Sequence, residues 1–88
     1  MDFTNLEEKL AELTGYDFEN AEKACRAKGD TTPDISFSKD FQSRLAAKAL
    51  GVKLDDVKKL PVNQYVSVTT KVSNFLFGSL VELVQQDK

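Results

Sequence analysis

Apolar residues recur along the chain at intervals of three and four, which is the spacing of residues on one face of a helix. The first such face consists of Leu6, Leu10 and Leu13. A second helix is predicted over residues 16–28, and its apolar face consists of Phe18, Ala21 and Cys25. The pattern therefore indicates two short amphipathic helices in the first third of the chain.

The ends of the second helix carry their own signals. Thr14 is followed three positions later by Asp17, which is the spacing of a capping box at a helix N-terminus. Gly29 is placed to end the helix, because glycine readily adopts the left-handed conformation that follows a last helical turn. Residues 28–34 combine glycine, proline and short polar residues, so they are predicted to form a loop.

The strongest helical pattern follows this loop. Its apolar stripe consists of Phe37, Phe41, Leu45, Ala49 and Val52. Several alanines raise the helix propensity of the segment. We expect this helix to begin near Ser36 or Ser38, since either side chain is a good N-cap, and to end at Gly51.

A short turn containing Val57 and Leu60 should come next, with Asp55 or Asp56 as its N-cap. Pro61 then fits the first position of a last helix. The segment after it has two periodicities. An alternation of β-branched residues, which would suit a strand, runs through Val66, Val68, Thr70 and Val72. A helical stripe continues for much longer, so we predict a helix, with Gly78 as a weak point within it.

These elements predict an all-α fold, a small single-domain bundle of about four to five helices that spans residues 1–88. A length of 88 residues suits one domain. The expected shared core consists of Phe41, Leu45, Ala49, Val57, Leu60, Val68 and Val72.

Charge is distributed unevenly along this chain, whose net charge is −2 at pH 7. Residues 1–22 contain seven acidic residues and one lysine, whereas residues 39–59 contain six basic and three acidic residues. A net negative protein is a poor binder of nucleic acids, so we expect no specific nucleic-acid partner. The uneven distribution could instead steer a protein partner or a second copy of the chain. The simpler interpretation is that both segments form solvated helix faces.

One motif leaves a DNA-binding alternative open. The spacing of a helix-turn-helix is matched by Ala47, Gly51 and Val57. The second helix of that motif would place the 55–56 aspartate pair near DNA phosphates and would be cut short by Pro61, which argues against DNA binding. A small regulator therefore stays an alternative, as does a structural head–tail connector subunit of a virus.

Catalysis and cofactor binding have little support. The chain lacks histidine, and its four glycines are scattered, so neither a histidine-based catalytic set nor a phosphate-binding loop can be assembled. The aspartate pair 55–56 is weak evidence for a cation site. We expect no enzymatic activity, no cofactor and no metal. We also expect no signal peptide and no membrane helix, and the single Cys25 is consistent with a reducing cytoplasm.

The most suggestive local feature is the run Phe75-Leu76-Phe77. Consecutive residues on a helix lie about 100° apart, so three bulky neighbours cannot all face one core. Either two neighbouring elements bury them, or part of the run meets a partner. We predict a partner-binding face on the last helix, formed by Phe77, Leu80, Val81 and Val84.

Several short motifs resemble those of phage tail assembly chaperones. The N-terminal ones are the runs 13–17 (LTGYD) and 21–23 (AEK), followed by Phe41-Gln42 and 45–52 (LAAKALGV). The C-terminal ones are 55–57 (DDV), Leu60-Pro61, Tyr65, Val68-Thr69, Val72 and 74–76 (NFL). Together they cover residues 13–78 in the family's order, and the chain departs from the pattern at Tyr16, where a basic residue is common.

This resemblance implies a function. Such chaperones bind the tape measure protein, keep it soluble in the host cytoplasm and help to recruit tail tube subunits, and they are absent from the finished virion. A frameshifted longer form often accompanies the short one. The resemblance implies that the tape measure and tail tube proteins are the partners of this chain.

Overall fold

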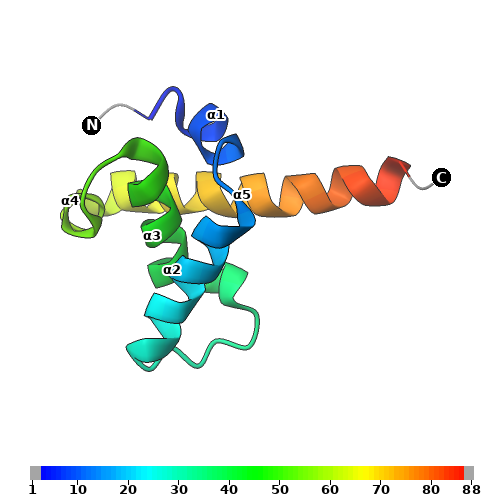
Figure 1. The fold of residues 1–88 in the computed structure, drawn as a ribbon. Helices are drawn as coiled ribbons and strands as arrows, with labels where there is room; N and C mark the ends of the chain where they lie inside the picture. The colour runs from blue at the N-terminus through cyan, green and yellow to red at the C-terminus, as the bar shows by residue number, and fades with distance from the viewer. Residues whose placement is uncertain (1–2, 87–88) are drawn as a thin grey trace.

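The computed structural model of the protein describes the backbone of residues 3–86 and the side chains of residues 3–78, and all regular structure in this part of the chain is helical (Figure 1). The elements are α1 (Leu6–Ala11), α2 (Gly15–Ala27), the 3-10 helix η1 (Ile35–Phe37), α3 (Lys39–Leu50), α4 (Leu54–Lys58) and α5 (Val62–Gln86). The predicted all-α fold of four to five helices is confirmed, and the segment after Pro61 is a helix rather than a strand.

Most helix ends lie where local signals predicted them. The backbone N–H of Thr14 donates to Asp17 Oδ2 at 2.9 Å, which holds the N-terminus of α2. Ser38, rather than Ser36, caps α3, and its Oγ accepts the Phe41 N–H at 3.3 Å. Gly51 ends α3 with a left-handed φ of 70°, a conformation that a side chain would strain.

The prediction for the start of α4 was wrong. Lys53, rather than Asp55 or Asp56, occupies the N-cap position. Asp56 lies in the first turn instead, and its Oδ2 accepts the Lys53 N–H at 3.1 Å. Pro61 likewise precedes α5 instead of opening it, and its carbonyl accepts the Tyr65 N–H at 2.9 Å.

The core forms around α3, which packs against α1, α2, α4, α5 and η1. Five of the seven predicted core residues are buried, and Ala49 and Leu60 are only partly buried at its edge. The buried apolar residues beyond that prediction are Leu6, Leu10, Cys25, Ile35, Ala46 and Ala47. The partly buried ring of Phe18 meets the buried ring of Phe41 edge to face, with their centroids 4.7 Å apart.

Phe37 was expected on the buried stripe of the third helix, but it is 62% exposed. The reason is local, because the cap at Ser38 places Phe37 in η1, before α3 begins. A residue outside the helix does not share the helix's register, so it leaves the stripe.

The longest helix, α5, lies across the bundle and runs past the other helices toward the C-terminus (Figure 1). Its buried side begins with Val68, Thr69 and Val72, which face the core. Within the described part of the chain, no helix combines the length and apolar character that crossing a membrane would require.

Candidate functional site

An apolar groove opens on the surface where α1 turns into α2 and both approach α3 and α5. Its volume is about 260 Å³. Six apolar side chains form its walls, namely Leu10, Leu13, Phe18, Leu45, Phe75 and Leu76, and Thr14 and Gly15 complete the lining. Leu10 and Leu45 are buried at its base, whereas the other four apolar residues are only partly buried. Solvent therefore reaches a continuous apolar surface at this place.

The helix ends explain why the groove is open. Capping by Thr14 starts α2 directly after the short α1, so Leu13 lies in the turn between the two helices. Gly15 adds no side chain, and a Cβ built at this position would meet nothing within 4 Å.

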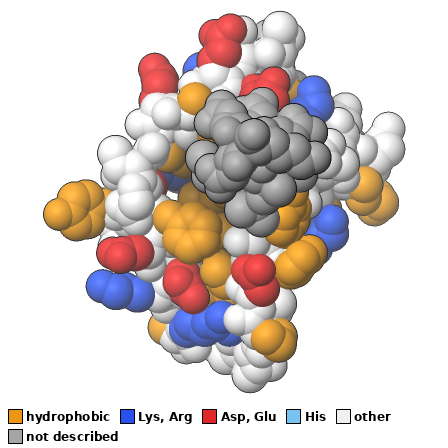
Figure 2. Space-filling model, turned by 90° about the vertical axis from the view of Figure 1, so that its right-hand side faces the viewer, with side chains coloured by type: hydrophobic (Ala, Val, Ile, Leu, Met, Phe, Trp, Pro, Cys, Tyr) orange, Lys and Arg blue, Asp and Glu red, His pale blue; other side chains and the backbone are white. Residues whose placement is uncertain are grey.

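On the face that Figure 2 shows, hydrophobic side chains gather next to the grey area, with charged side chains around them.

The residues of the run Phe75-Leu76-Phe77 contact two different parts of the molecule. Phe75 and Leu76 line the groove, while the Phe77 ring packs against Phe37 with a centroid distance of 4.8 Å. All three are partly buried. Phe77 is thus the described member of the predicted partner-binding face, and it lies against η1 rather than in the groove. The side chains of Leu80, Val81 and Val84 lie outside the described residues.

Sequence reasoning missed the groove as a candidate site. Leu10 and Leu13 were predicted as one face of the first helix, and Phe75-Leu76 was singled out, but nothing in the sequence paired segments more than 60 residues apart. The sequence feature that could have indicated the groove is the excess of apolar residues in both the first and the last helix.

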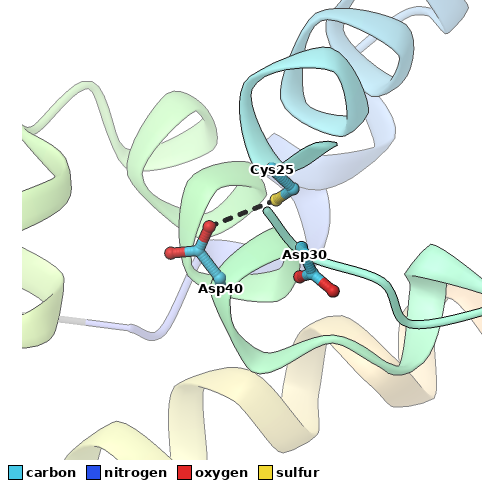
Figure 3. Close-up of side chains that lie close together, drawn as sticks. All are labelled: Cys25, Asp30 and Asp40. Carbon is cyan, nitrogen blue, oxygen red and sulfur yellow. Dashed lines mark hydrogen bonds between the residues drawn. The ribbon is translucent and has the colours of Figure 1, made fainter. Parts of the chain in front are cut away.

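A second candidate is a polar cluster of Cys25, Asp30 and Asp40, whose side chains come from α2, the following loop and α3 (Figure 3). The Cys25 thiol donates to Asp40 Oδ2 at 3.3 Å. The same carboxylate accepts the Arg44 Nε–H at 2.9 Å, and its other oxygen accepts a hydrogen bond from the Lys58 ammonium. Asp40 therefore joins α2, α3 and α4.

The charges of the cluster favour an ionised Asp40 and a neutral Cys25. Burial by itself would raise the pKa of Asp40, but the hydrogen bonds from Lys58 and Arg44 outweigh it and hold this pKa far below its usual range. Burial, and then the hydrogen bond to Asp40, raise the pKa of the Cys25 thiol to about 11.

The loop after α2 is fixed by its own polar contacts. Asp30 Oδ2 accepts the Ser38 hydroxyl at 2.5 Å, and Oδ1 accepts the Thr32 hydroxyl at 2.6 Å. Hydrogen bonds from Ser38 and Thr32 lower the pKa of Asp30 to about 2. The Arg26 guanidinium donates to the carbonyls of Asp30 and Thr32 at 3.0 and 2.6 Å. The loop is thereby tied to both α2 and the start of α3.

The three ligand-type atoms lie within 4.8 Å of one another, which invites a test for a metal site. Each oxygen of Asp30 and Asp40 already accepts a hydrogen bond, and Cys25 holds its proton to high pH. A metal would have to displace the thiol proton and compete with the hydrogen bonds that these oxygens accept. In the structure these side chains form a structural clasp between α2, α3 and α4.

The environment of Cys25 predicts low reactivity. In the folded protein, alkylation by iodoacetamide at pH 8 should be at least about a hundredfold slower than in denaturant, since the pKa rises from 9.0 to about 11 and only the thiolate reacts. Mass spectrometry over a time course measures the two rates. Equal rates in the folded and denatured protein would contradict the burial and the bond to Asp40.

No family model matches this chain, and neither a curated protein nor a solved structure is similar enough to match. The fold and the groove thus define its class, a small helical domain with an open apolar groove on its surface.

Proposed function

We propose that this protein is a phage tail assembly chaperone, and that it binds the tape measure protein through the groove of α1, α2, α3 and α5. The observation that carries the proposal is the groove itself, an apolar surface open to solvent in a domain with a well-packed core. The family motifs over residues 13–78 support the particular assignment, and three of them, at 13–17, 45–52 and 74–76, contribute lining residues.

The lining of the groove, which is apolar and open to solvent, favours the apolar side chains of a protein client over a polar small molecule. The lining residues carry no titratable side chain, so the groove offers no general acid, base or metal ligand. It is suited to receive a few apolar side chains of a polypeptide.

Weak binding at each groove suits a chaperone that tail tube subunits later displace. A long tape measure protein exposes apolar helical surface along its length, and a domain of this size covers only a short stretch. Many copies therefore act on one client. Because each contact is small, tail tube subunits displace the copies one at a time as the tube grows, and the chaperone is absent from the finished virion.

The shape of α4 speaks against the alternative of a DNA-binding regulator. It contains five residues, and Asp55 and Asp56 lie in its first turn. A recognition helix has to span the major groove, and carboxylates near its N-terminal end would face DNA phosphates.

The test is co-expression with the tape measure protein encoded in the same genome. The wild-type chain should keep that protein soluble and co-purify with it, because the client's apolar side chains enter the groove. The variant Leu76→Ser should lose the client, since it places a hydroxyl in the apolar wall. Pull-down and the soluble fraction of client are the two measurements.

Val62→Ser is the matched control, because Val62 lies on the same helix, is 80% exposed and does not line the groove. A thermal melt of both variants separates lost binding from lost folding. A tape measure protein that is equally soluble without the chain, or a chain that is found in purified virions, would overturn the proposal.

A further inference from the structure

We infer that the groove recognises one kind of client segment, an amphipathic helix whose apolar ridge is flanked on one edge by lysine and arginine. This inference rests on the proposed function and adds the chemistry of the partner. Two observations carry it. They are the geometry of the groove and the charge of the α1–α2 wall, which is the side of the groove formed by α1, α2 and the turn between them.

The partner segment is a helix because the described residues offer nothing that would bind a strand. No strand occurs among residues 3–86, so an extended peptide finds no sheet edge to pair with. A groove between helices instead receives side chains that project from one face of a helix at spacings of three and four. The volume of about 260 Å³ is suited to a few such side chains.

The α1–α2 wall is acidic. Between residues 6 and 27, which span α1 and α2, the chain carries six acidic residues and three basic ones. Asp17 uses its carboxylate to cap α2, and Glu22 lies 3.6 Å from Arg26. The other four, Glu7, Glu8, Glu12 and Glu19, are exposed and have no cationic partner within 4 Å among the described residues.

Two of these unpaired glutamates adjoin the groove in sequence. Glu12 precedes the lining residue Leu13, and Glu19 follows the lining residue Phe18. A cation at the edge of a bound helix would meet unpaired carboxylates here, whereas an acidic edge would be repelled. The α3 side differs, because Arg44 and Lys48 line a neighbouring hollow next to Leu45. The complementary helix is therefore basic on the edge that faces α1 and α2.

The two basic helices of a second copy do not supply such a helix. Its basic residues are concentrated in residues 39–59, where α3 forms the centre of the core and the one buried residue of α4 is Val57. Neither helix has a free apolar ridge to insert. The C-terminal stretch 79–86 is apolar in sequence, but Glu82 is its only charged residue.

Two synthetic helical peptides of equal length test the inference with the full-length protein. Both carry the same leucine ridge, and one has lysine where the other has glutamate along a single edge. Fluorescence anisotropy should show about tenfold tighter binding of the lysine peptide at low salt, the sum of two or three exposed charge pairs. The preference should shrink as salt screens these pairs.

Three variants locate the binding. Glu12→Lys should remove most of the preference for the lysine peptide, while Asp55→Lys, which changes the net charge equally on the exposed surface of α4, should retain it. Gly15→Phe should weaken both peptides, because it adds a bulky side chain to the groove lining at a position where a Cβ meets nothing within 4 Å. A thermal melt checks that this variant folds.

Equal affinity for both peptides, equal effects of the two lysine variants, or unchanged binding by Gly15→Phe would each overturn the inference. Self-association that Gly15→Phe abolishes would overturn it too, because a second copy would then be the occupant. If the tape measure protein co-purifies but the peptides show no preference, this inference fails and the proposed function stands. If the preference holds without co-purification, the proposed function fails instead.

Discussion

Replacing Phe41 with alanine should remove most of the stability of this protein. Phe41 is fully buried in the first turn of α3, and its ring packs edge to face on Phe18 at 4.7 Å. Truncating a buried phenylalanine costs about 3–5 kcal/mol, because apolar burial is lost and a cavity remains. A chain of this length has a total stability on the order of 4–13 kcal/mol at the usual value per residue. We therefore expect a largely unfolded population at 37 °C.

Urea denaturation followed by far-UV circular dichroism measures this loss. Tyr16→Ala is the matched control, since that aromatic side chain is 80% exposed and its removal should change the free energy of unfolding by less than about 0.5 kcal/mol. Phe41→Leu should lie between the two, because leucine fills part of the space. Similar midpoints for Phe41→Ala and the wild type would show that α2 does not pack on α3 as described.

The second large effect is expected from Asp40→Asn. This change keeps the shape of the side chain but removes the charge that Arg44 and Lys58 share, and it replaces an acceptor with an N–H₂ group. Hydrogen bonds to charged groups contribute about 1.5–3 kcal/mol each at most, and Asp40 is 23% exposed, so water offsets part of the loss. We expect a loss of about 1–3 kcal/mol in urea denaturation.

Asp55→Asn serves as the control for Asp40→Asn. Asp55 is exposed on α4, and no hydrogen bond or ion pair of its side chain occurs among the described residues. Its replacement should leave the free energy of unfolding nearly unchanged. If both aspartates prove equally dispensable, the clasp between α2, α3 and α4 does not stabilise the fold.

The same clasp gives stability a defined dependence on pH. Asp30 has a pKa lowered from 3.8 to about 2, and that of Asp40 is lowered as well, so the unfolded chain binds protons more readily as pH falls. Their contribution is complete above about pH 5 and is lost progressively as the pH falls toward 2. Cys25 acts at the other end. Its pKa is raised from 9.0 to about 11, so its contribution is present below pH 9 and is lost as pH rises between these values.

Denaturation midpoints measured from pH 2 to pH 11 should thus form a plateau that falls at both ends. Asp40→Asn should flatten the acid side, since one of the two depressed carboxyls is gone. It should also reduce the fall on the alkaline side, because Asp40 contributes to the raised pKa of Cys25 and its loss brings the folded pKa closer to the unfolded value of 9.0. A variant with the same pH profile as the wild type would contradict this assignment of the groups.

Sequence alone determined the helical class and most of the helix ends. The capping pair Thr14–Asp17 and the left-handed Gly51 depend on residues at most a few positions apart. Their hydrogen bonds and dihedral angles can therefore be predicted from the sequence. The buried stripe from Phe41 to Val72 also followed from spacing, because apolar periodicity states which face turns inward. The errors lay at helix starts. Phe37 precedes α3 because Ser38 rather than Ser36 is the cap, and the N-cap of α4 is Lys53, two residues before Asp55.

The tertiary structure alone decided which faces meet. Leu13 and Phe75 share a groove although 61 positions separate them, and the Cys25 thiol, expected to be merely apolar, donates to Asp40 on another helix. Such contacts depend on the angles at which helices cross and on the length of the turns between them. Small differences in packing energy among several arrangements set these angles, and no single residue along the chain encodes them.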